Sequence, residues 1–356
     1  MLKKTFAIIL LPLLLVTSGL LTTCDETPPV QMYFALGTLC SINLFEDGNE
    51  QLYSRITSLL NEIDVTMTAY PSEEWVMLFG LAAVNAQAGT IPTGTATIGI
   101  GDAFFDVLEK ALYYAELSDG AFDPTVGPLV KLWGIGTEEE QIPGDEAIAA
   151  ALELVNWRDV ETDRRRRIVY LRRKGMALDF GAIAKGYAAD AAAQIAREAN
   201  VKRAIFDLGG NIVTLGWREQ KEGKEPLPWR VGVQNPLGDR GAYIGVLQVH
   251  DKSVVTSGVY ERFFELDGKR YHHILSTRNG YPVDNGLLAV TIVADHSIDA
   301  DALATTVFAL GYEQGKALID SIPDIEALFI FDDHSVTITS GLAGIFELTN
   351  NTFTMK

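Results

Sequence analysis

One segment, running from residue 177 to residue 190 as Ala-Leu-Asp-Phe-Gly-Ala-Ile-Ala-Lys-Gly-Tyr-Ala-Ala-Asp, constrains the fold of this chain most. Two apolar residues lead into Asp179, a turn of small residues follows, and the rest has the pattern of a helix. A strand-to-helix turn leaves free backbone N–H groups at the positive end of the helix, where an anion can bind. Asp179 and Lys185 flank the turn with opposite charges, which favours a ligand that carries phosphate, with a metal ion as a further candidate. An ordinary turn in which Gly181 serves only packing explains the segment equally well.

The N-terminal segment indicates export rather than a folded element. Two lysines precede an apolar run over residues 6–21, and Leu21-Thr-Thr-Cys24 has the form of a lipoprotein cleavage site. A transmembrane anchor is the alternative, but the run is shorter than the roughly 20 residues of a span, and Pro12 interrupts it. We therefore expect a signal peptide over residues 1–23 and a mature domain over residues 24–356. Cys24 would carry the lipid anchor, making the protein a membrane-anchored lipoprotein on the periplasmic face of a bacterial membrane.

Charge excludes one class of partner. The formal net charge is −18, and removal of residues 1–23 takes two lysines and no acidic residue. Such an acidic body repels nucleic acid and anionic lipid headgroups, so no nucleic-acid partner is expected. The run Arg164–Arg167 precedes a strand-like stretch and is best explained as a solvated hairpin tip. Because lipidation of Cys24 would leave Cys40 without a partner, we expect Cys40 to be a small buried apolar residue.

The order of helical and strand patterns predicts the fold class. Helical spacing or capping signals mark residues 51–63, 102–117, 145–154, 183–199 and 297–310. Strand patterns mark residues 32–45, 167–180 as a hairpin, most of 203–293, 325–331 and 335–339. Because helices and strands do not alternate strictly, the pattern favours an α+β fold over a doubly wound sheet, as one large domain or two interleaved subdomains.

A second segment carries side chains suited to binding a metal ion: Asp299-Ala-Asp-Ala-Leu-Ala-Thr-Thr306. Asp301 and Thr305 are four residues apart, so they share one face of the predicted helix. A carboxylate and a hydroxyl are hard oxygen ligands of the kind that magnesium takes, together with water and phosphate. The structural alternative is that the helix dipole favours Asp301 and that Thr305 bonds back to the carbonyl of Asp301.

Two further segments carry candidate binding groups. Gly120-Ala-Phe-Asp-Pro-Thr-Val-Gly-Pro128 is a rigid loop in which Asp123 would accept hydrogen bonds from an amino group or a ribose, and Phe122 or Trp133 would contact a ring. A purely structural turn is the alternative. His272 and His273 alternate across a predicted strand, so only one faces a given side, and their spacing does not match a zinc site. His273 beside a phosphate site would bind phosphate or accept a proton.

Six motifs in one order resemble a known family. They are Gly120-Ala-Phe-Asp-Pro-Thr125, Leu178-Asp-Phe-Gly-Ala-Ile-Ala-Lys-Gly186, Asp207-Leu-Gly-Gly-Asn211, Thr256-Ser-Gly258, His273-Ile274 and Asp301-Ala-Leu-Ala-Thr305. Together they resemble the ApbE family, the FAD:protein FMN transferases, over nearly the whole mature chain. The resemblance implies an ApbE-like fold of two interleaved α/β subdomains, with FAD bound in the cleft between them.

The resemblance also implies a magnesium-dependent transferase. Such an enzyme moves FMN from FAD to a Ser or Thr hydroxyl of an exported acceptor flavoprotein and releases AMP. Some relatives instead hydrolyse FAD to FMN and AMP, so an FAD pyrophosphatase is one alternative. A non-catalytic FAD-binding lipoprotein is the other.

The family's site residues map onto this sequence. Contacts with FAD fall on Leu36, Tyr70, Ala121, Phe122, Asp123, Asp179, Lys185 and Ile274. The Mg²⁺ positions fall on the backbone carbonyl of Ala182, on Asp301 and on Thr305. For the proton acceptor of the attacking hydroxyl, His273 is our first catalytic candidate and Asp301 the second. This chain departs from the family at Leu36, where Met is usual, and between Tyr70 and Asn85, where a Ser-rich loop is usual.

Overall fold

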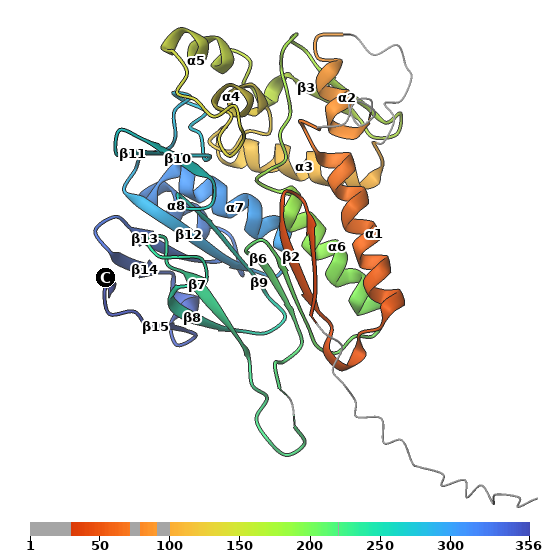
Figure 1. The fold of residues 1–356 in the computed structure, drawn as a ribbon, viewed down its shortest axis with the longest axis vertical. Coiled ribbons are helices and arrows are strands. Elements are labelled where there is room, and N and C mark those ends of the chain that lie inside the picture. Colours follow the sequence, from red (N-terminus) through yellow and green to blue (C-terminus); the bar gives the residue numbers. More distant parts are fainter. Residues whose placement is uncertain (1–29, 72–78, 91–99, 220) are drawn as a thin grey trace, which may run out of the picture.

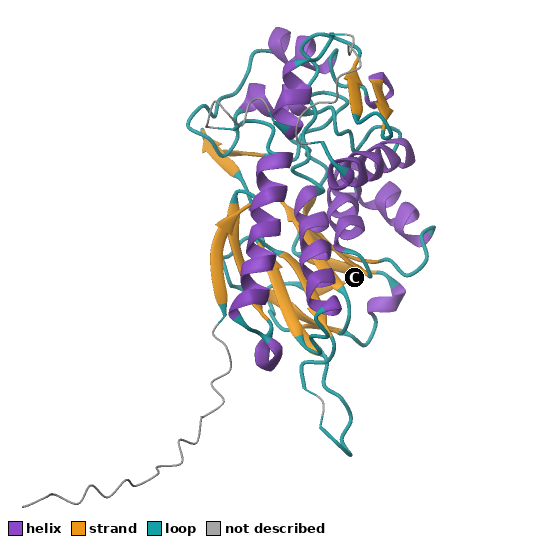
Figure 2. Ribbon diagram, turned by 90° about the vertical axis from the view of Figure 1, so that its right-hand side faces the viewer, coloured by secondary structure: helices purple, strands orange, loops and turns teal. Residues whose placement is uncertain are grey.

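The computed structural model describes residues 30–71, 79–90, 100–219 and 221–356 and places them in an α+β fold (Figures 1 and 2). The predicted fold class is therefore confirmed. The predicted signal peptide and Cys24 lie outside the described residues, and the extent of the mature domain stays a prediction. Within the described ranges, no helix combines the length and the apolar character needed to cross a membrane.

A nine-stranded sheet forms the centre of the molecule. Every neighbouring pair is antiparallel except the last, β14 with β16. In sheet order the strands are β1 (Gln31–Ala35), β2 (Thr38–Asn43), β5 (Ala204–Leu208), β6 (Asn211–Leu215), β9 (Ser253–Gly258), β12 (Leu287–Ala294), β13 (Glu326–Phe331), β14 (Ser335–Ile338) and β16 (Thr354–Met355). The inner strand β12 is buried almost throughout, because layers cover both faces of the sheet.

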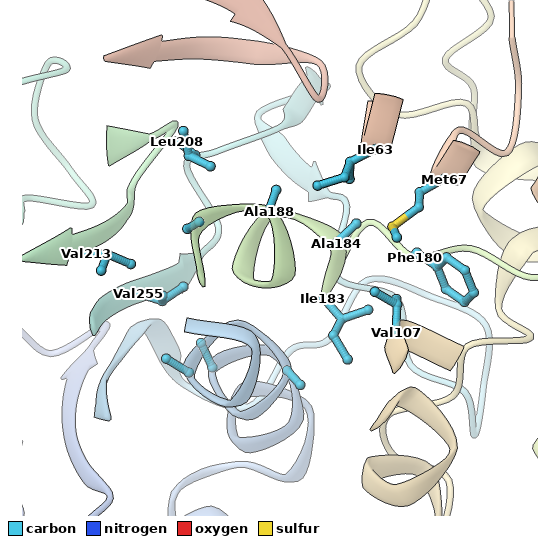
Figure 3. Close-up of a cluster of buried hydrophobic side chains, with 14 of the residues drawn as sticks. Ile63, Met67, Val107, Phe180, Ile183, Ala184, Ala188, Leu208, Val213 and Val255 are labelled. Atoms are coloured by element: carbon cyan, nitrogen blue, oxygen red, sulfur yellow. The ribbon is translucent and has the colours of Figure 1, made fainter. Parts of the chain in front are cut away.

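Helices cover one face of this sheet, as Figure 2 shows. They are α1 (Glu50–Met67), α6 (Ala184–Glu198), α7 (Ser297–Leu310) and α8 (Tyr312–Asp320). Helix α6 is rich in buried alanines, among them Ala188 and Ala192. In Figure 3, α6 lies between Ile63 and Met67 of α1 and the sheet residues Val213 and Val255. Small side chains let α6 approach both neighbours closely, which places its N-terminus against α7.

A smaller sheet covers the opposite face. Its strands are β7 (Trp229–Gln234), β8 (Tyr243–Val249) and β15 (Phe346–Leu348), in the order β15-β8-β7. Val231 and Leu247 of this sheet pack with Val254, Leu328 and Ile330 of the large sheet in a second core. The two-sheet packing buries much of the far side of the central sheet, and β7 with the β7–β8 connection also lines the main cavity.

The remaining elements lie at one end of the molecule, at the top of Figure 1. They are α2 (Gly80–Ala86), α3 (Asp102–Leu117), α4 (Gly127–Trp133), α5 (Asp145–Leu152), the hairpin of β3 (Val160–Asp163) and β4 (Ile168–Leu171), and the hairpin of β10 (Phe263–Leu266) and β11 (Lys269–His272). Short 3-10 helices occur at η1 (Phe45–Asp47), η3 (Trp157–Asp159) and η4 (Ser340–Leu342). The helices predicted over residues 51–63, 102–117, 145–154, 183–199 and 297–310 are confirmed as α1, α3, α5, α6 and α7.

Two predicted strand segments were wrong in detail. The strand predicted over residues 32–45 is the β1–β2 hairpin, because Leu36 (φ 54°) and Gly37 (φ 67°) make a two-residue turn with positive φ. The hairpin predicted over residues 167–180 instead spans 160–171, with Arg164–Arg167 at its tip as expected. At this tip Arg164 pairs with Asp106 and Glu109 of α3.

Candidate active site

A cavity of about 1110 Å³ lies where the helical end of the molecule meets the β1–β2 turn, the start of α6 and the side of α7. Its volume is slightly above the range of about 300–1,000 Å³ that is usual for ligand pockets. Of the twelve predicted site residues, ten line it: Ala121, Phe122, Asp123, Asp179, Ala182, Lys185, His273, Ile274, Asp301 and Thr305. These residues come from four separate stretches of the chain, so the fold gathers nearly all of the predicted constellation in one place.

Two predicted FAD contacts do not line the cavity. Leu36 occupies the β1–β2 turn, and its neighbours Gly37 and Thr38 line the cavity in its place. Tyr70 is 43% exposed, and its hydroxyl donates a hydrogen bond to the carbonyl of Gly127 (2.7 Å). Its assigned contact therefore stays a prediction, and the structure gives Tyr70 a role in fixing the start of α4.

The turn that precedes α6 is held by one hydrogen bond to a distant segment and one within the turn itself. The Asp179 N–H donates to the carbonyl of Pro124 (2.7 Å), and Asp179 Oδ1 accepts from the Gly181 N–H (2.7 Å). No strand leads into this turn, because Ala177 makes only an isolated bridge with Val126. The expected strand-to-helix turn is thus a loop-to-helix turn, whose apolar lead-in is buried without a sheet.

Asn85 supplies the partners that a neighbouring strand would otherwise provide. Its Oδ1 accepts from the Leu178 N–H (2.7 Å), and its Nδ2 donates to the Leu178 carbonyl (2.9 Å). Leu178 is fully buried, so both backbone groups depend on this one side chain. We expect Asn85→Ala to lower the free energy of unfolding by about 2 kcal/mol, because it leaves two buried backbone groups unpaired. Chemical denaturation measures the change, and an unchanged midpoint would contradict this reading of the contact.

Helices α6 and α7 meet at the centre of the site. The Gly186 N–H of α6 donates to Asp301 Oδ2 of α7 (2.8 Å), and Lys185 Nζ lies 3.7 Å from Asp301 Oδ1. Asp190 of α6 caps α7, since its two carboxylate oxygens accept from the N–H groups of Ser297 (2.8 Å) and Ile298 (2.9 Å). Ser297 is the first helical residue of α7. These bonds hold the buried Asp301 carboxylate, 2% exposed, at the cavity wall.

The predicted metal residues Asp301, Thr305 and Ala182 all line the cavity and supply oxygen groups to its wall, here called the oxygen-rich patch. Thr305 Oγ1 lies 3.2 Å from Ser257 Oγ and makes no hydrogen bond to the backbone of its own helix. The neighbouring Thr306 does make such a bond, since its hydroxyl donates to the Ala302 carbonyl (2.7 Å). Asp301 and Ala182 also line the cavity. In the described part of the chain, no group of three or more His, Cys, Asp or Glu residues could hold a metal ion. The donor chemistry here, one carboxylate with a hydroxyl and a carbonyl, fits magnesium, which needs few protein ligands.

The described cavity lining carries more acidic than basic groups. Six carboxylates face four cationic side chains: Asp123, Asp179, Asp207, Asp239, Glu261 and Asp301 against Lys185, Arg240, Arg262 and Arg270. A wall with this balance repels a phosphate-bearing ligand unless a further cation accompanies it. The charge balance therefore also fits a divalent ion at the oxygen-rich patch.

His273 and Glu261 form the titratable pair of the cavity. His273 Nε2 lies 3.9 Å from Glu261 Oε2, and His273 Nδ1 lies 3.3 Å from the Arg262 carbonyl. Their side chains are 31% and 29% exposed, but that surface faces the cavity, so bulk water solvates their charges poorly. Desolvation, reinforced by the nearby Arg262 charge, lowers the pKa of His273 to about 3. Desolvation raises the pKa of Glu261 to about 7.

The other histidine of the pair points away from the cavity. His272 is buried, and its Nε2 lies 2.9 Å from the Val283 carbonyl. The strand alternation therefore separates the two side chains as predicted, with only His273 on the cavity side.

Asp123 already satisfies both of its oxygens within the protein. Oδ1 accepts from the Thr125 N–H (2.8 Å) and hydroxyl (2.6 Å), and Oδ2 accepts from the Trp157 N–H (3.0 Å). Burial raises the pKa of this carboxyl. Asp123 thus organises the loop that follows α3, which was the structural alternative, while it still lines the cavity. Phe122 and Trp133, the two candidate ring contacts, also line it.

Four residues that build the site were not singled out from the sequence. Asn85 and Asp190 act through side-chain bonds to distant backbone, and Gly186 acts by lacking a side chain. Glu261 follows the Thr-Ser-Gly motif by a few residues. Its position beside His273 could be found only by predicting the path of the β9–β10 connection.

Comparison with known proteins places this chain in a family. The ApbE family model matches residues 36–329. A FAD:protein FMN transferase of Treponema pallidum (strain Nichols) is 37% identical, covering 90% of this chain and 89% of the relative. One of Klebsiella pneumoniae (strain 342) is 38% identical, covering 82% and 86%. Among solved structures, the ApbE protein of Thermotoga maritima has a TM-score of 0.72 at 29% identity, covering 91% of this chain and 97% of that chain. The apo flavinyl transferase ApbE of Pseudomonas stutzeri has a TM-score of 0.71 at 27% identity, covering 89% and 97%.

Proposed function

The chain belongs to the ApbE family, and from this premise we propose that it is a FAD:protein FMN transferase. It moves FMN from FAD to a Ser or Thr hydroxyl of an exported acceptor flavoprotein and releases AMP. The observation that carries the proposal is the convergence of Lys185, His273, Asp301 and Thr305 on one cavity. We also propose that Cys24 carries a lipid anchor, which would hold the enzyme at the periplasmic face of a bacterial membrane beside exported acceptors.

The oxygen-rich patch supports a dependence on magnesium. The Asp301 carboxylate, the Thr305 hydroxyl and the Ala182 carbonyl would hold Mg²⁺. When bound there, the ion would neutralise the charge that develops on the phosphate groups. The acidic balance of the described lining is the main support, because an anionic dinucleotide enters such a cavity unfavourably on its own.

The protein's own groups would orient FAD. Lys185 supplies a cation beside Asp301, and the backbone of the Asp179–Gly181 turn lies next to the start of α6, where the helix dipole favours phosphate. Ala121, Phe122 and Ile274 supply an apolar wall for a ring. Substrate positioning of this kind accounts for most of the catalysis in phosphoryl transfer.

His273 would take the proton of the attacking hydroxyl. The hydroxyl oxygen forms a bond to the phosphorus of the FMN half, the bond from that phosphorus to the bridging oxygen breaks, and AMP leaves with that oxygen. If Nδ1–H donates to the Arg262 carbonyl, the lone pair of Nε2 is free to accept the proton. The low pKa of His273 keeps the ring neutral at physiological pH, so it is in the accepting form.

Mass spectrometry tests the proposal. The mature protein is incubated with FAD, Mg²⁺ and an exported flavoprotein that has a Ser or Thr modification site, and the acceptor and the free nucleotides are measured. We expect an FMN mass increment on the acceptor and one AMP for each increment. Release of FMN and AMP without any increment would indicate an FAD pyrophosphatase. Tight FAD binding with no product would indicate a non-catalytic binding lipoprotein.

The hydrolytic alternative has one observation in its favour. His273 and Glu261 are each about one third open to the cavity, so water can reach the proton acceptor when no acceptor protein is present. We therefore expect slow FAD hydrolysis without acceptor, and its suppression when acceptor is added.

A further inference from the structure

We propose that Glu261 is the final acceptor of the proton that the attacking hydroxyl releases, and that it receives this proton through His273. The inference rests on the proposed function and extends it to a residue outside the predicted constellation. It assigns to Glu261 a relay role, in which it acts through His273 and does not itself touch the substrate.

The position of the pair carries the proposal. Glu261 lies in the connection between β9 and β10, and His273 directly follows β11, so a β-hairpin joins them and sets their spacing. The Arg262 carbonyl accepts from the His273 N–H (3.1 Å) and lies 3.3 Å from Nδ1, which fixes the ring. Nε2 is then the ring atom left for the substrate, and Glu261 Oε2 is 3.9 Å from it. A small rotation of the flexible Glu side chain closes this gap to a hydrogen bond, as often happens when a substrate binds.

The surrounding charges explain why His273 needs a relay partner. Charged groups from several elements act on Glu261: Lys185 of α6, Asp301 of α7, Arg240 of the β7–β8 connection, and Arg262 beside it. Arg262 and Lys185 also destabilise an imidazolium, so His273 holds a proton only transiently at neutral pH. The Glu261 carboxylate, with a pKa of about 7, is the stronger base of the two.

The proton balance follows directly. As the oxygen–phosphorus bond forms and the bond to AMP breaks, the hydroxyl proton moves to His273 Nε2. It then passes from Nε2 to Glu261 Oε2, which leaves His273 neutral and Glu261 protonated. Release of this proton to water after AMP departs resets the site. Glu261 must therefore begin each turnover as a carboxylate.

The test compares Glu261→Gln with Glu261→Asp in the full mature protein, with FAD, Mg²⁺ and acceptor present. We expect Glu261→Gln to lower kcat by about 10²-fold or more, with the Kd for FAD within about 3-fold of the wild type. The wild-type kcat should fall as pH drops below about 7, because the carboxylate is then lost, and this decline should be absent in Glu261→Gln. Glu261→Asp should restore part of the rate and the decline. Glu198→Gln is the matched control, since Glu198 at the end of α6 is exposed and pairs with the exposed Arg55 of α1, and neither residue lines the cavity.

Two outcomes of the kinetic comparison would overturn the relay while leaving the proposed function intact. One is a wild type that transfers FMN and a Glu261→Gln variant that keeps its kcat and pH profile. The other is a Glu261→Gln variant that loses only FAD or Mg²⁺ affinity, which would make Glu261 a binding group.

Infrared difference spectra of the ligand-free protein between about pH 6 and about pH 8 give a readout without turnover. A carboxyl band that titrates in the wild type and is missing from Glu261→Gln supports the relay; its absence from the wild type would sink it. A wild type with neither transfer nor hydrolysis would refute the proposed function itself.

Discussion

Replacing Asp301 with Asn is expected to abolish magnesium-dependent turnover, with a loss in kcat of about 10³-fold or more. The Asn oxygen can still accept from the Gly186 N–H, so the α6–α7 contact and the fold should survive. What is lost is the negative charge that would hold the cation, and a bound cation contributes several kcal/mol of charge stabilisation in phosphoryl transfer. Turnover is measured as AMP and FMN release at increasing Mg²⁺, and metal affinity by calorimetric titration.

Asp299 provides the matched control for this experiment. It lies in the first turn of the same helix, but its Oδ1 accepts from Lys110 Nζ (2.9 Å) and the Tyr114 hydroxyl (2.6 Å), and it does not line the cavity. Asp299→Asn should therefore keep the wild-type Mg²⁺ requirement, and it should lower stability only by weakening the contact with α3, because the charge is lost while the oxygen still accepts. If Asp301→Asn and Asp299→Asn have the same turnover and the same Mg²⁺ affinity, Asp301 is not a metal ligand.

The parts of the site that sequence could predict depend on local geometry. Asp301 and Thr305 lie on one wall because helical residues four apart share a face, whatever the rest of the fold does. His272 and His273 diverge because strand side chains alternate. The helix boundaries of α1, α6 and α7 follow from apolar spacing and from glycines such as Gly311, which has φ of 80°.

The parts that sequence could not predict depend on contacts between distant segments. Asp190 caps a helix that begins 107 positions later, and Asn85 pairs with backbone 93 positions away. The apolar lead-in to Asp179 has the composition of a strand, yet Asn85 and Pro124 take the place of strand neighbours. Leu36 adopts a positive φ that apolar residues seldom adopt, so an alternating pattern concealed the turn between β1 and β2.

Gly186→Ala is expected to have the second largest effect, on both stability and turnover. A Cβ at this position would overlap the carbonyl oxygen of Ser297 and lie 2.7 Å from both the Asp301 Cβ and the Ile298 Cα. Two of these neighbours are backbone atoms of α7, which cannot move without shifting the helix. We expect the free energy of unfolding to fall by about 3 kcal/mol or more, because the two helices separate and the bond from Gly186 to Asp301 is lost. Denaturant unfolding and Mg²⁺-dependent FAD turnover measure the two effects.

Whether Gly186→Ala lowers or raises the free energy of unfolding distinguishes the close α6–α7 contact from ordinary helix propensity. Gly186 is in the first turn of α6 with no positive φ, and an unhindered Gly→Ala change in a helix stabilises it by up to about 1 kcal/mol. Gly144→Ala serves as the control, because Gly144 precedes α5 and a Cβ there would meet nothing within 4 Å. It should change stability by less than about 1 kcal/mol and leave turnover at the wild-type level. Stabilisation by Gly186→Ala would show that α6 and α7 are not in close contact at this point, and the position assigned to the Asp301 carboxylate would then be wrong.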